Sequence, residues 1–225
     1  MDWSALSLSV QLGGLTVLVL LPMALFIGRW LAYQQFSGKS LIEALLAVPL
    51  VLPPTVVGYY LLVGLGGQSI IGRLFEKIHG QGLVFHFSGL LIASILVNIP
   101  FAIQPIQRAF ESIPREVRDA AACCGMSFWR RLWLVEFPLA WPGVLTAMVL
   151  TFAHTLGEFG VVLMVGGNIP GETKTIAIAI YDRVQSFDLD AASTMSFVLL
   201  IFSITVIALA SALGRRFGRR YGSIR

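Results

Sequence analysis

Residues 113–138 read IPREVRDAAACCGMSFWRRLWLVEFP, a charged segment rich in small residues that separates two long apolar runs. Charged side chains are costly in hydrocarbon, so we expect this segment to lie outside a membrane. Pro114 suits the first turn of a helix with Ser112 or Ile113 as its cap, and Gly125 suits the end of that helix. One narrow face of the helix, of the kind that docks into a groove on a partner, would carry Val117, Ala121, Cys124 and Phe128.

The segment resembles the EAA loop of ABC importer permeases. Asp119-Ala120-Ala121, Gly125 and Val135-x-Phe137-Pro138 keep the spacing of that loop, with Asp in place of the usual Glu and Phe in place of the usual Leu. The resemblance implies a type-1 ABC importer permease fold, in which cytoplasmic coupling helices dock on an ATP-binding subunit. The residues implied for this contact are Arg115, Glu116, Val117, Arg118, Asp119, Ala120, Ala121, Cys124, Gly125, Phe128 and Trp129.

The composition is that of a polytopic membrane protein. Of the 225 residues, 56% are hydrophobic and 12% are charged, whereas soluble domains carry about 25% charged residues. A membrane-spanning helix needs about 20 residues, and five apolar runs are long enough: 8–27, 41–65, 89–107, 139–165 and 191–213. We therefore expect an all-α, polytopic transmembrane helical bundle with five spans.

Residues 7–213 would form the transmembrane domain, and residues 214–225 a basic cytoplasmic tail. The second apolar run is interrupted by Pro49, Pro53 and Pro54. Proline removes backbone hydrogen bonds that lipid cannot replace, so this part of the run must face protein or water. If the run splits into two shorter helices, the bundle would have six spans.

The positive charges set the expected orientation. Twelve of the 16 Lys and Arg residues lie in 28–40, 108–138 and 214–225, and the other four in 66–88 and 166–190. By the positive-inside rule the first three segments are cytoplasmic, which places the N-terminus outside the plasma (inner) membrane and the C-terminus inside. The arginines of the tail then anchor the topology, and no nucleic acid is expected as a partner. The two adjacent cysteines lie on the cytoplasmic side and are expected to be reduced thiols.

Further stretches resemble oxyanion importer permeases, the class that serves molybdate, tungstate and sulfate. They are Gly157-Glu158-Phe159-Gly160, residues 166–175 (GGNIPGETKT) and Ala179-Ile180-Tyr181. Residues 50–59 (LVLPPTVVGY) and 85–89 (FHFSG) are most similar to the molybdate member. Together with the EAA-like loop, the resemblance covers residues 8–213.

This resemblance implies the membrane-spanning subunit of an ATP-driven importer, which forms the path for a tetrahedral oxyanion. Molybdate is the expected substrate, with tungstate or sulfate as alternatives. The implied partners are a second copy of the chain, two cytoplasmic ATP-binding subunits, an extracytoplasmic oxyanion-binding protein and membrane lipid. Candidates for the path or its gate, with plain packing as the alternative role, are Pro54, Thr55, Gly157 and Glu158.

The chain itself shows no ATP site. Ser37-Gly38-Lys39-Ser40 looks like the end of a phosphate-binding loop, but Tyr33 stands where the first glycine of that loop belongs, and no strand is expected before it. We therefore expect no enzyme activity and no cofactor in this chain, with ATP bound by a partner subunit.

His154 and Glu158 are four residues apart in the fourth apolar run, so they share a helix face. Two ligands are too few for a metal site, and we expect Glu158 to be hydrogen-bonded at a helix break or a subunit contact. A less favoured reading is an ion-coupled secondary transporter, which would depend on these two ionisable residues. An intramembrane enzyme would need a nucleophile with a base, or a metal site, and neither is recognisable in the sequence.

The interiors of the predicted spans contain no Lys or Arg, and Arg108 lies only at a cytoplasmic end. A dianion would then meet polar groups and helix dipoles but no strong fixed counter-charge. We therefore expect affinity and selectivity to reside in the external binding protein.

The orientation can be tested by single-cysteine labelling on a Cys123→Ser, Cys124→Ser background. A membrane-impermeant reagent should reach cysteines placed at Glu76 or Glu172 in intact cells, and should not reach those at Arg118 or Arg219, because the positive-inside rule puts the latter in the cytoplasm. If a cysteine at Trp3 reacted only after permeabilisation, the N-terminus would be cytoplasmic and the count of five spans would fail.

Overall fold

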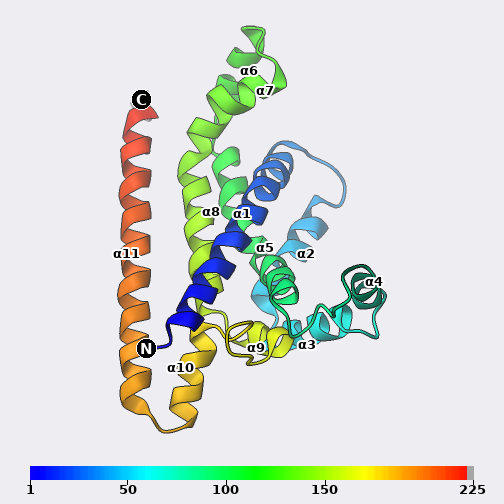
Figure 1. Cartoon of the computed structure of the whole chain (residues 1–225). Coiled ribbons are helices and arrows are strands. Elements are labelled where there is room, and N and C mark those ends of the chain that lie inside the picture. Colours follow the sequence, from blue (N-terminus) through cyan, green and yellow to red (C-terminus); the bar gives the residue numbers. More distant parts are fainter. Residues whose placement is uncertain (222–225) are drawn as a thin grey trace.

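The computed structural model describes residues 1–221, without the side chains of 210, 211 and 213–221, and every regular element in that range is a helix (Figure 1). Four helical stretches are long and apolar enough to cross a membrane. They are α1 (Trp3–Tyr33), α5 (Phe87–Glu111), α8 with the turns before it (Phe128–Gly157) and the apolar part of α11 (Leu189–Tyr221). A fifth apolar segment is the bent pair formed by α2 (Lys39–Val51) and α3 (Pro54–Leu65). The expected all-α transmembrane bundle is confirmed.

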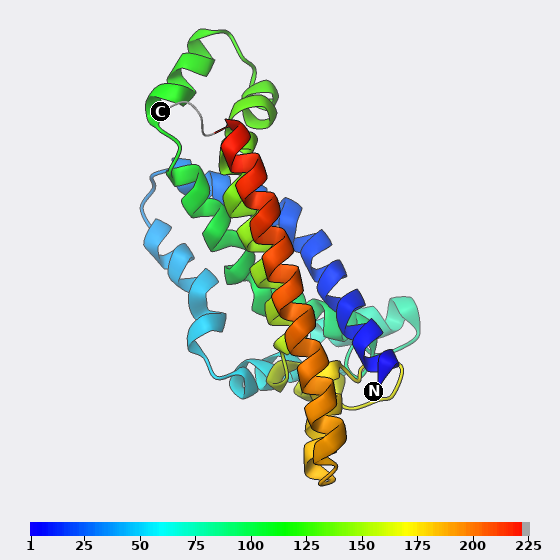
Figure 2. The ribbon, with the colours of Figure 1, turned by 90° about the vertical axis from the view of Figure 1, so that its left-hand side faces the viewer.

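The helices α1, α5 and α8 pack against one another at the centre of the bundle, with α11 along α8 and α2 along α5 (Figures 1 and 2). At one end, which we call the α6 end, the short helices α6 (Arg115–Cys123) and α7 (Phe128–Arg131) project beyond the other helices. The opposite end, the α10 end, holds the N-terminus, α4 (Ile70–His79), α9 (Gly160–Gly166) and α10 (Ile176–Gln185). The last turns of α11 lie toward the α6 end, so the two described ends of the chain are at opposite ends of the bundle.

The second apolar run does break, but the break adds no span. Leu52 and Pro53 separate α2 from α3, and the two helices meet at an angle of 108°. With 13 and 12 residues, they are about 20 and 18 Å long at 1.5 Å per residue, whereas the hydrocarbon is about 30 Å thick. Neither half can cross a membrane alone, so the alternative of six spans is wrong.

The fourth apolar run was predicted to continue through residue 165, and this boundary is wrong. The helix α8 ends at Gly157, and α9 is a separate short helix. The chain leaves the helical conformation at Glu158, whose Oε1 accepts a hydrogen bond from the backbone N–H of Val161 at 3.0 Å. This contact satisfies one of the free N–H groups at the start of α9, which makes the break stable.

The helices extend further than hydropathy alone predicted. The first helix starts at Trp3, where the Asp2 carboxylate accepts from the backbone N–H of Ala5 at 3.0 Å, and it runs to Tyr33. The helix α5 runs to Glu111. Arg29 and Arg108 therefore lie within long helices and not beyond their ends. The predicted basic tail, 214–225, begins as the last turns of α11, and residues 222–225 lie outside the described range.

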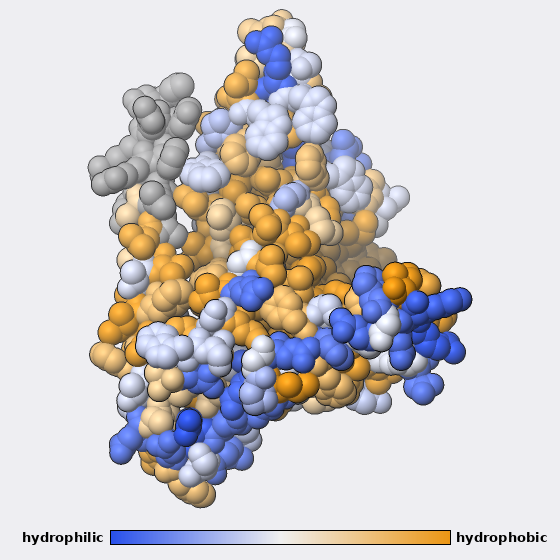
Figure 3. Space-filling model, viewed as in Figure 1, coloured by the Kyte–Doolittle hydropathy of each residue, from blue (hydrophilic) through white to orange (hydrophobic). Residues whose placement is uncertain are grey.

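Apolar side chains cover the middle of the molecule, and hydrophilic ones gather at the α10 end (Figure 3). The helix α4 lies near this end with Ile70, Ile71, Leu74 and Ile78 exposed beside its charged residues. An amphipathic helix of this kind suits the boundary between hydrocarbon and head groups.

Small residues allow the central helices to approach closely. A Cβ atom added at Gly143 of α8 would lie 2.3 Å from the Cβ of Ala109 and 2.7 Å from the backbone oxygen of Pro105, both in α5. Packing through small residues is how helices associate in lipid, where no hydrophobic driving force acts between them. The contact between α5 and α8 therefore depends on the missing side chain of Gly143.

We predict that Gly143→Ala destabilises the bundle by about 1–3 kcal/mol, because the added methyl group overpacks the contact with backbone atoms. Gly14→Ala in α1 is the matched control, since nothing lies within 4 Å of a Cβ built there. This control should be neutral, or stabilising by up to about 1 kcal/mol. The unfolding temperature of the purified protein in detergent is the measurement, and equal values for the two variants would contradict the prediction.

Candidate functional site

The segment expected to contact an ATP-binding subunit stands clear of the bundle at the α6 end (Figure 1). The helix α6 begins at Arg115, with Pro114 as its cap, so the predicted cap at Ser112 or Ile113 is wrong by one or two residues. The short helix α7 follows, capped by Ser127 without a side-chain hydrogen bond. A single π-helical turn, Leu132–Glu136, then joins α7 to α8.

Gly125 ends α6 as the sequence predicts. Its φ angle is +69°, in the left-handed region that favours glycine. The N–H of Met126 bonds to the carbonyl oxygen of Ala121 at 3.3 Å, and the N–H of Gly125 to that of Ala122 at 2.9 Å. These two bonds are those of a Schellman motif, which turns the chain sharply after a helix.

The predicted docking face is only partly free. Ala121 is 7% exposed, so it packs against its own chain and not in a partner's groove. Cys124 and Phe128 lie beyond the end of α6, so they do not extend the face of that helix. Arg118 is half-buried, with its guanidinium carbon 3.8 Å from the centre of the Tyr33 ring. The other predicted coupling residues are exposed: Arg115, Glu116, Val117, Asp119, Ala120, Cys124, Gly125, Phe128 and Trp129.

A buried ion cluster ties this segment to the bundle. Glu136 is fully buried at the end of the π-helical turn, and its Oε2 accepts from Nε of Arg29 at 2.5 Å. The Nε of Arg131 lies 3.1 Å from Oε1 of Glu136. The Arg29 guanidinium also lies 4.6 Å from the centre of the Phe128 ring in α7. The end of α1 therefore holds both α7 and the start of α8.

This cluster was not predicted from the sequence. The available signal was a single glutamate, Glu136, between apolar residues at the end of the EAA-like loop. A lone acid in such surroundings requires a basic partner. Local sequence does not indicate that the partner is Arg29, because that residue is 107 positions away.

At the other end, the structure brings together the four residues predicted for a path or gate. Pro54 and Thr55 begin α3, and Gly157 and Glu158 end α8. A Cβ built on Gly160 would lie 2.8 Å from the Cβ of Pro54 and 3.6 Å from the backbone nitrogen of Thr55. The two breaks therefore lie against each other. Pro54, Thr55 and Gly157 are exposed, whereas Glu158 is 7% exposed.

A polar network runs from Glu158 into the centre of the bundle. His154 Nε2 lies 3.7 Å from Oε2 of Glu158, and its Nδ1 lies 3.2 Å from Oδ1 of Asn98. Asn98 donates to the hydroxyl of Thr155 at 3.1 Å. Glu158 is thus hydrogen-bonded at a helix break, as expected. In the described part of the chain, no three His, Cys, Asp or Glu side chains gather as a metal site would require.

Residues 166–175 and 179–181, which resemble segments of oxyanion importer permeases, form part of the α10 end. Thr173 is fully buried, and its hydroxyl accepts from the backbone N–H of Ile169 at 3.2 Å. Asp182 binds Lys174 at 2.6 Å and Asn168 at 2.9 Å. Burial alone would raise the pKa of Asp182, but the hydrogen bonds from Lys174 and Asn168 hold it below its ordinary value. The loop is therefore well ordered by its own contacts and presents a defined surface.

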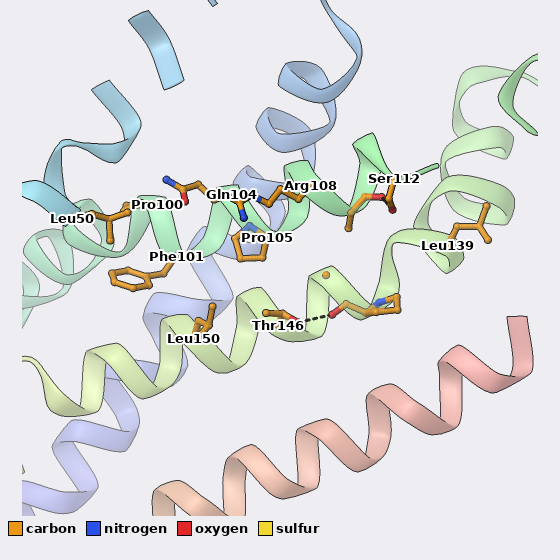
Figure 4. Close-up of a pocket in the computed structure, with 13 residues that line it drawn as sticks. Leu50, Pro100, Phe101, Gln104, Pro105, Arg108, Ser112, Leu139, Thr146 and Leu150 are labelled. Atoms are coloured by element: carbon orange, nitrogen blue, oxygen red, sulfur yellow. Dashed lines mark hydrogen bonds between the residues drawn. The ribbon is translucent and has the colours of Figure 1, made fainter. Parts of the chain in front are cut away.

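A cavity of about 690 Å³ lies between α2, α5 and α8 (Figure 4). It extends along α5 from Pro100 to Ser112, that is, from the middle of the bundle toward the α6 end. Of the 13 residues that line it, Arg108 alone is charged. None of the four predicted path residues lines this cavity. Pro100 and Pro105, both inside α5, line this cavity. They were the signal in the sequence that could have indicated the cavity.

A second cavity of about 550 Å³ lies on the other side of Gln104 and Arg108, toward α2. Its two carboxylates accept from the same amide: Nε2 of Gln107 donates to Glu43 at 2.7 Å and to Glu111 at 2.9 Å. The Nζ of Lys39 lies 3.9 Å from Oε1 of Glu43. Lys39 therefore lies near Glu43, Glu111 is bound by the uncharged amide of Gln107, and Arg108 lines the same cavity.

Comparison with known proteins places the chain in a family. Residues 22–223 match the sequence profile of the family described as "Binding-protein-dependent transport system inner membrane component". The chain is 43% identical to the molybdenum transport system permease protein ModB of Azotobacter vinelandii, over 96% of this chain and 95% of that protein. It is 35% identical to ModB of Haemophilus influenzae, over 99% of this chain and 97% of that protein.

Solved structures share the fold at low sequence identity. A bacterial ABC transporter involved in the import of the acidic polysaccharide alginate has a chain that matches with a TM-score of 0.77 at 16% identity, over 95% of this chain and 78% of that one. An amino acid ABC transporter matches with a TM-score of 0.63 at 18% identity, over 96% and 93% of the two chains. The family match and the ModB relatives agree with this fold, and the chain belongs to the inner membrane components of binding-protein-dependent transport systems.

Proposed function

We propose that this chain forms the membrane path for molybdate in an ATP-driven importer. The observation that carries the proposal is the 43% identity with a molybdenum transport permease over 96% of the chain. Relatives named as sulfate transport permeases are more distant, such as the one of Chlorella vulgaris at 32% identity over 93% of this chain. Sulfate, or tungstate as a third tetrahedral oxyanion, is therefore the second candidate substrate.

The proposed assembly has two copies of this chain, two ATP-binding subunits and an oxyanion-binding protein. The ATP-binding subunits would dock at the α6 end, where most side chains from Arg115 to Trp129 are exposed. The binding protein would deliver the anion at the α10 end, which would face outside the plasma membrane. No cofactor would belong to this chain itself.

In this proposal, ATP binding displaces α6 and α7, and the displacement reaches the bundle through Glu136. Because Glu136 contacts both Arg29 in α1 and Arg131 before α8, the three elements move together. The ATP-binding subunit can shift the equilibrium between inward- and outward-facing states only if it binds the two states with different affinity. The 690 Å³ cavity would be the part of the path nearest the cytoplasm.

The test is reconstitution in proteoliposomes with the ATP-binding subunit and the oxyanion-binding protein of the same cell. Molybdate uptake should require ATP on the side of the membrane that carries the ATP-binding subunit, and should be absent without ATP. Uptake that continues without ATP but follows an ion gradient would favour a secondary transporter instead. Competition with sulfate and tungstate ranks the three candidate substrates.

We predict that Gly125→Val uncouples ATP hydrolysis from uptake. A β-branched residue at a φ of +69° costs roughly 1–2 kcal/mol in the left-handed region, so the turn after α6 should be lost. Gly80→Val is the matched control, because Gly80 ends α4 with a φ of +74° and likewise has nothing within 4 Å of a built Cβ. The measurement is the molybdate taken up per ATP hydrolysed, together with retention of the ATP-binding subunit in a pull-down.

The Gly125 variant should lower the uptake per ATP or lose the ATP-binding subunit, while both variants insert into the membrane normally. The Gly80 variant should keep the wild-type ratio. Wild-type coupling in the Gly125 variant would show that the segment after Arg115 does not carry the contact.

A further inference from the structure

We propose that Arg108 is an oxyanion contact inside the 690 Å³ cavity, which meets the anion on its way toward the α6 end. The inference rests on the proposed function, since it concerns the same substrate class. It adds a residue and a site that the predicted path residues do not include. The site lies on α5, where Gln104 and Arg108 line this cavity (Figure 4). The same two residues also line the second cavity.

The cavity has the size of a small-molecule site and carries one net positive charge. Small-molecule sites usually measure about 300–1,000 Å³, so a volume of about 690 Å³ holds a tetrahedral oxyanion together with water. The rest of its wall is uncharged and mostly apolar, with polar groups at Gln104, Ser112 and Thr146. The hydroxyls of Ser112 and Thr146 already donate to the backbone oxygens of Ala109 and Pro142. Arg108 and Gln104 are thus the side chains that keep free donors there.

Arg108 has no ion-pair partner among the described side chains, although Glu43 and Glu111 line the second cavity beside it. Glu43 and Glu111 accept hydrogen bonds from Gln107, and Glu43 also lies near Lys39. Among the side chains that the structure describes, none forms an ion pair or hydrogen bond with Arg108. Three of the other basic residues of the α6 end differ in this respect, since Arg29 and Arg131 contact Glu136 and Arg115 contacts Asp119. The guanidinium of Arg108 is therefore available to an anion.

The chemistry of the group suits a tetrahedral oxyanion. A guanidinium presents donors in a planar fork that matches two oxygens of the same anion. Gln104 lies one helical turn away on the same face of α5 and adds an amide donor. Because Arg108 is exposed, water screens the attraction and keeps it weak. The contact should speed the passage of the anion without holding it.

A role of this kind predicts a change in rate and not in affinity for the delivered substrate. In the complete transporter in proteoliposomes, Arg108→Gln should lower the maximal uptake of molybdate about threefold to fivefold, the effect of one solvent-exposed charge pair. The concentration of loaded binding protein that gives half-maximal uptake should not change. Arg108→Lys keeps the charge and should recover a large part of the rate. Arg73→Gln, which removes an exposed charge on α4 outside both cavities, should keep the wild-type rate.

A second measurement detects the contact directly and needs no transport. The permease with its ATP-binding subunit, in detergent, is treated with the arginine reagent phenylglyoxal, and modification is read by mass spectrometry. Millimolar molybdate or sulfate should protect Arg108 from the reagent, relative to chloride at equal ionic strength. Arg73, exposed on α4 and outside the cavity, should not be protected.

The outcomes separate the inference from the proposed function. If the wild-type transporter imports no molybdate, the proposed function fails, and the protection of Arg108 still decides whether the cavity takes an oxyanion. Failure of both anions to protect Arg108 would overturn the inference. It would also be overturned if Arg108→Gln transported at the wild-type rate, if Arg108→Lys were as defective as Arg108→Gln, or if Arg73→Gln showed the same loss.

Discussion

A helix that breaks inside a membrane leaves backbone polar groups that lipid cannot satisfy, and much of this bundle follows from that constraint. The chain breaks two helical stretches, between α2 and α3 and between α8 and α9, and the structure packs the starts of α3 and α9 against each other. Gly160 permits the contact with Pro54, and Gly58 permits the contact with Met164. Each broken end therefore has protein beside it. As a result, α3 and α9 lie across the α10 end instead of continuing along the bundle (Figure 1).

A second constraint acts at the α6 end, where a fully buried carboxylate requires positive partners. Removing one partner of a buried ion pair costs about 3–5 kcal/mol, because the other charge is left without compensation. Glu136 therefore fixes Arg29 and Arg131, and with them the start of α8 against the end of α1. The exposed segment from Arg115 to Trp129 has few other attachments to the bundle. The proposed ATP-binding subunit at the α6 end would thus have a rigid connection to two of the three central helices.

The sequence predicted features that depend on neighbouring residues. Apolar runs predicted the helical segments, and Gly125 was identified as a helix end, confirmed by its φ of +69°. Pro53 and Pro54 marked the bend between α2 and α3, whereas Pro49 lies inside α2 and does not interrupt it. The sequence did not predict features that depend on distant residues. The hydropathy pattern predicted one helix over residues 139–165, because hydropathy carries no information about hydrogen bonds. The helix ends where the Glu158 carboxylate accepts a hydrogen bond from the backbone N–H of Val161. It also could not reveal that Ala121 is buried, since a small apolar residue suits a docking face and a core position equally well.

The candidate site divides in the same way. The residues of the coupling segment were found because they follow a linear spacing, whereas the cavity was not, because its wall combines residues from α2, α5 and α8. Arg108 was noticed, but only as a charge at the end of a span. Because α5 continues to Glu111, Arg108 lies on the helix wall of the cavity and not beyond the end of the span.

The positions of the paired arginine, Arg29, and of the unpaired arginine, Arg108, suit an importer of dianions. A path must attract the ion enough for it to enter and release it easily enough for it to leave. A deeply buried, unpaired arginine would bind a dianion too strongly to release it. Arg29, whose side chain is 14% exposed, is neutralised by Glu136. The unpaired arginine, Arg108, is exposed to the cavity, where screening keeps the attraction shallow. Such a group interacts with the oxygens that molybdate and sulfate share, so it has little basis for distinguishing them. In the proposed assembly, selection between these anions would then occur before the anion reaches the cavity, in the proposed oxyanion-binding protein.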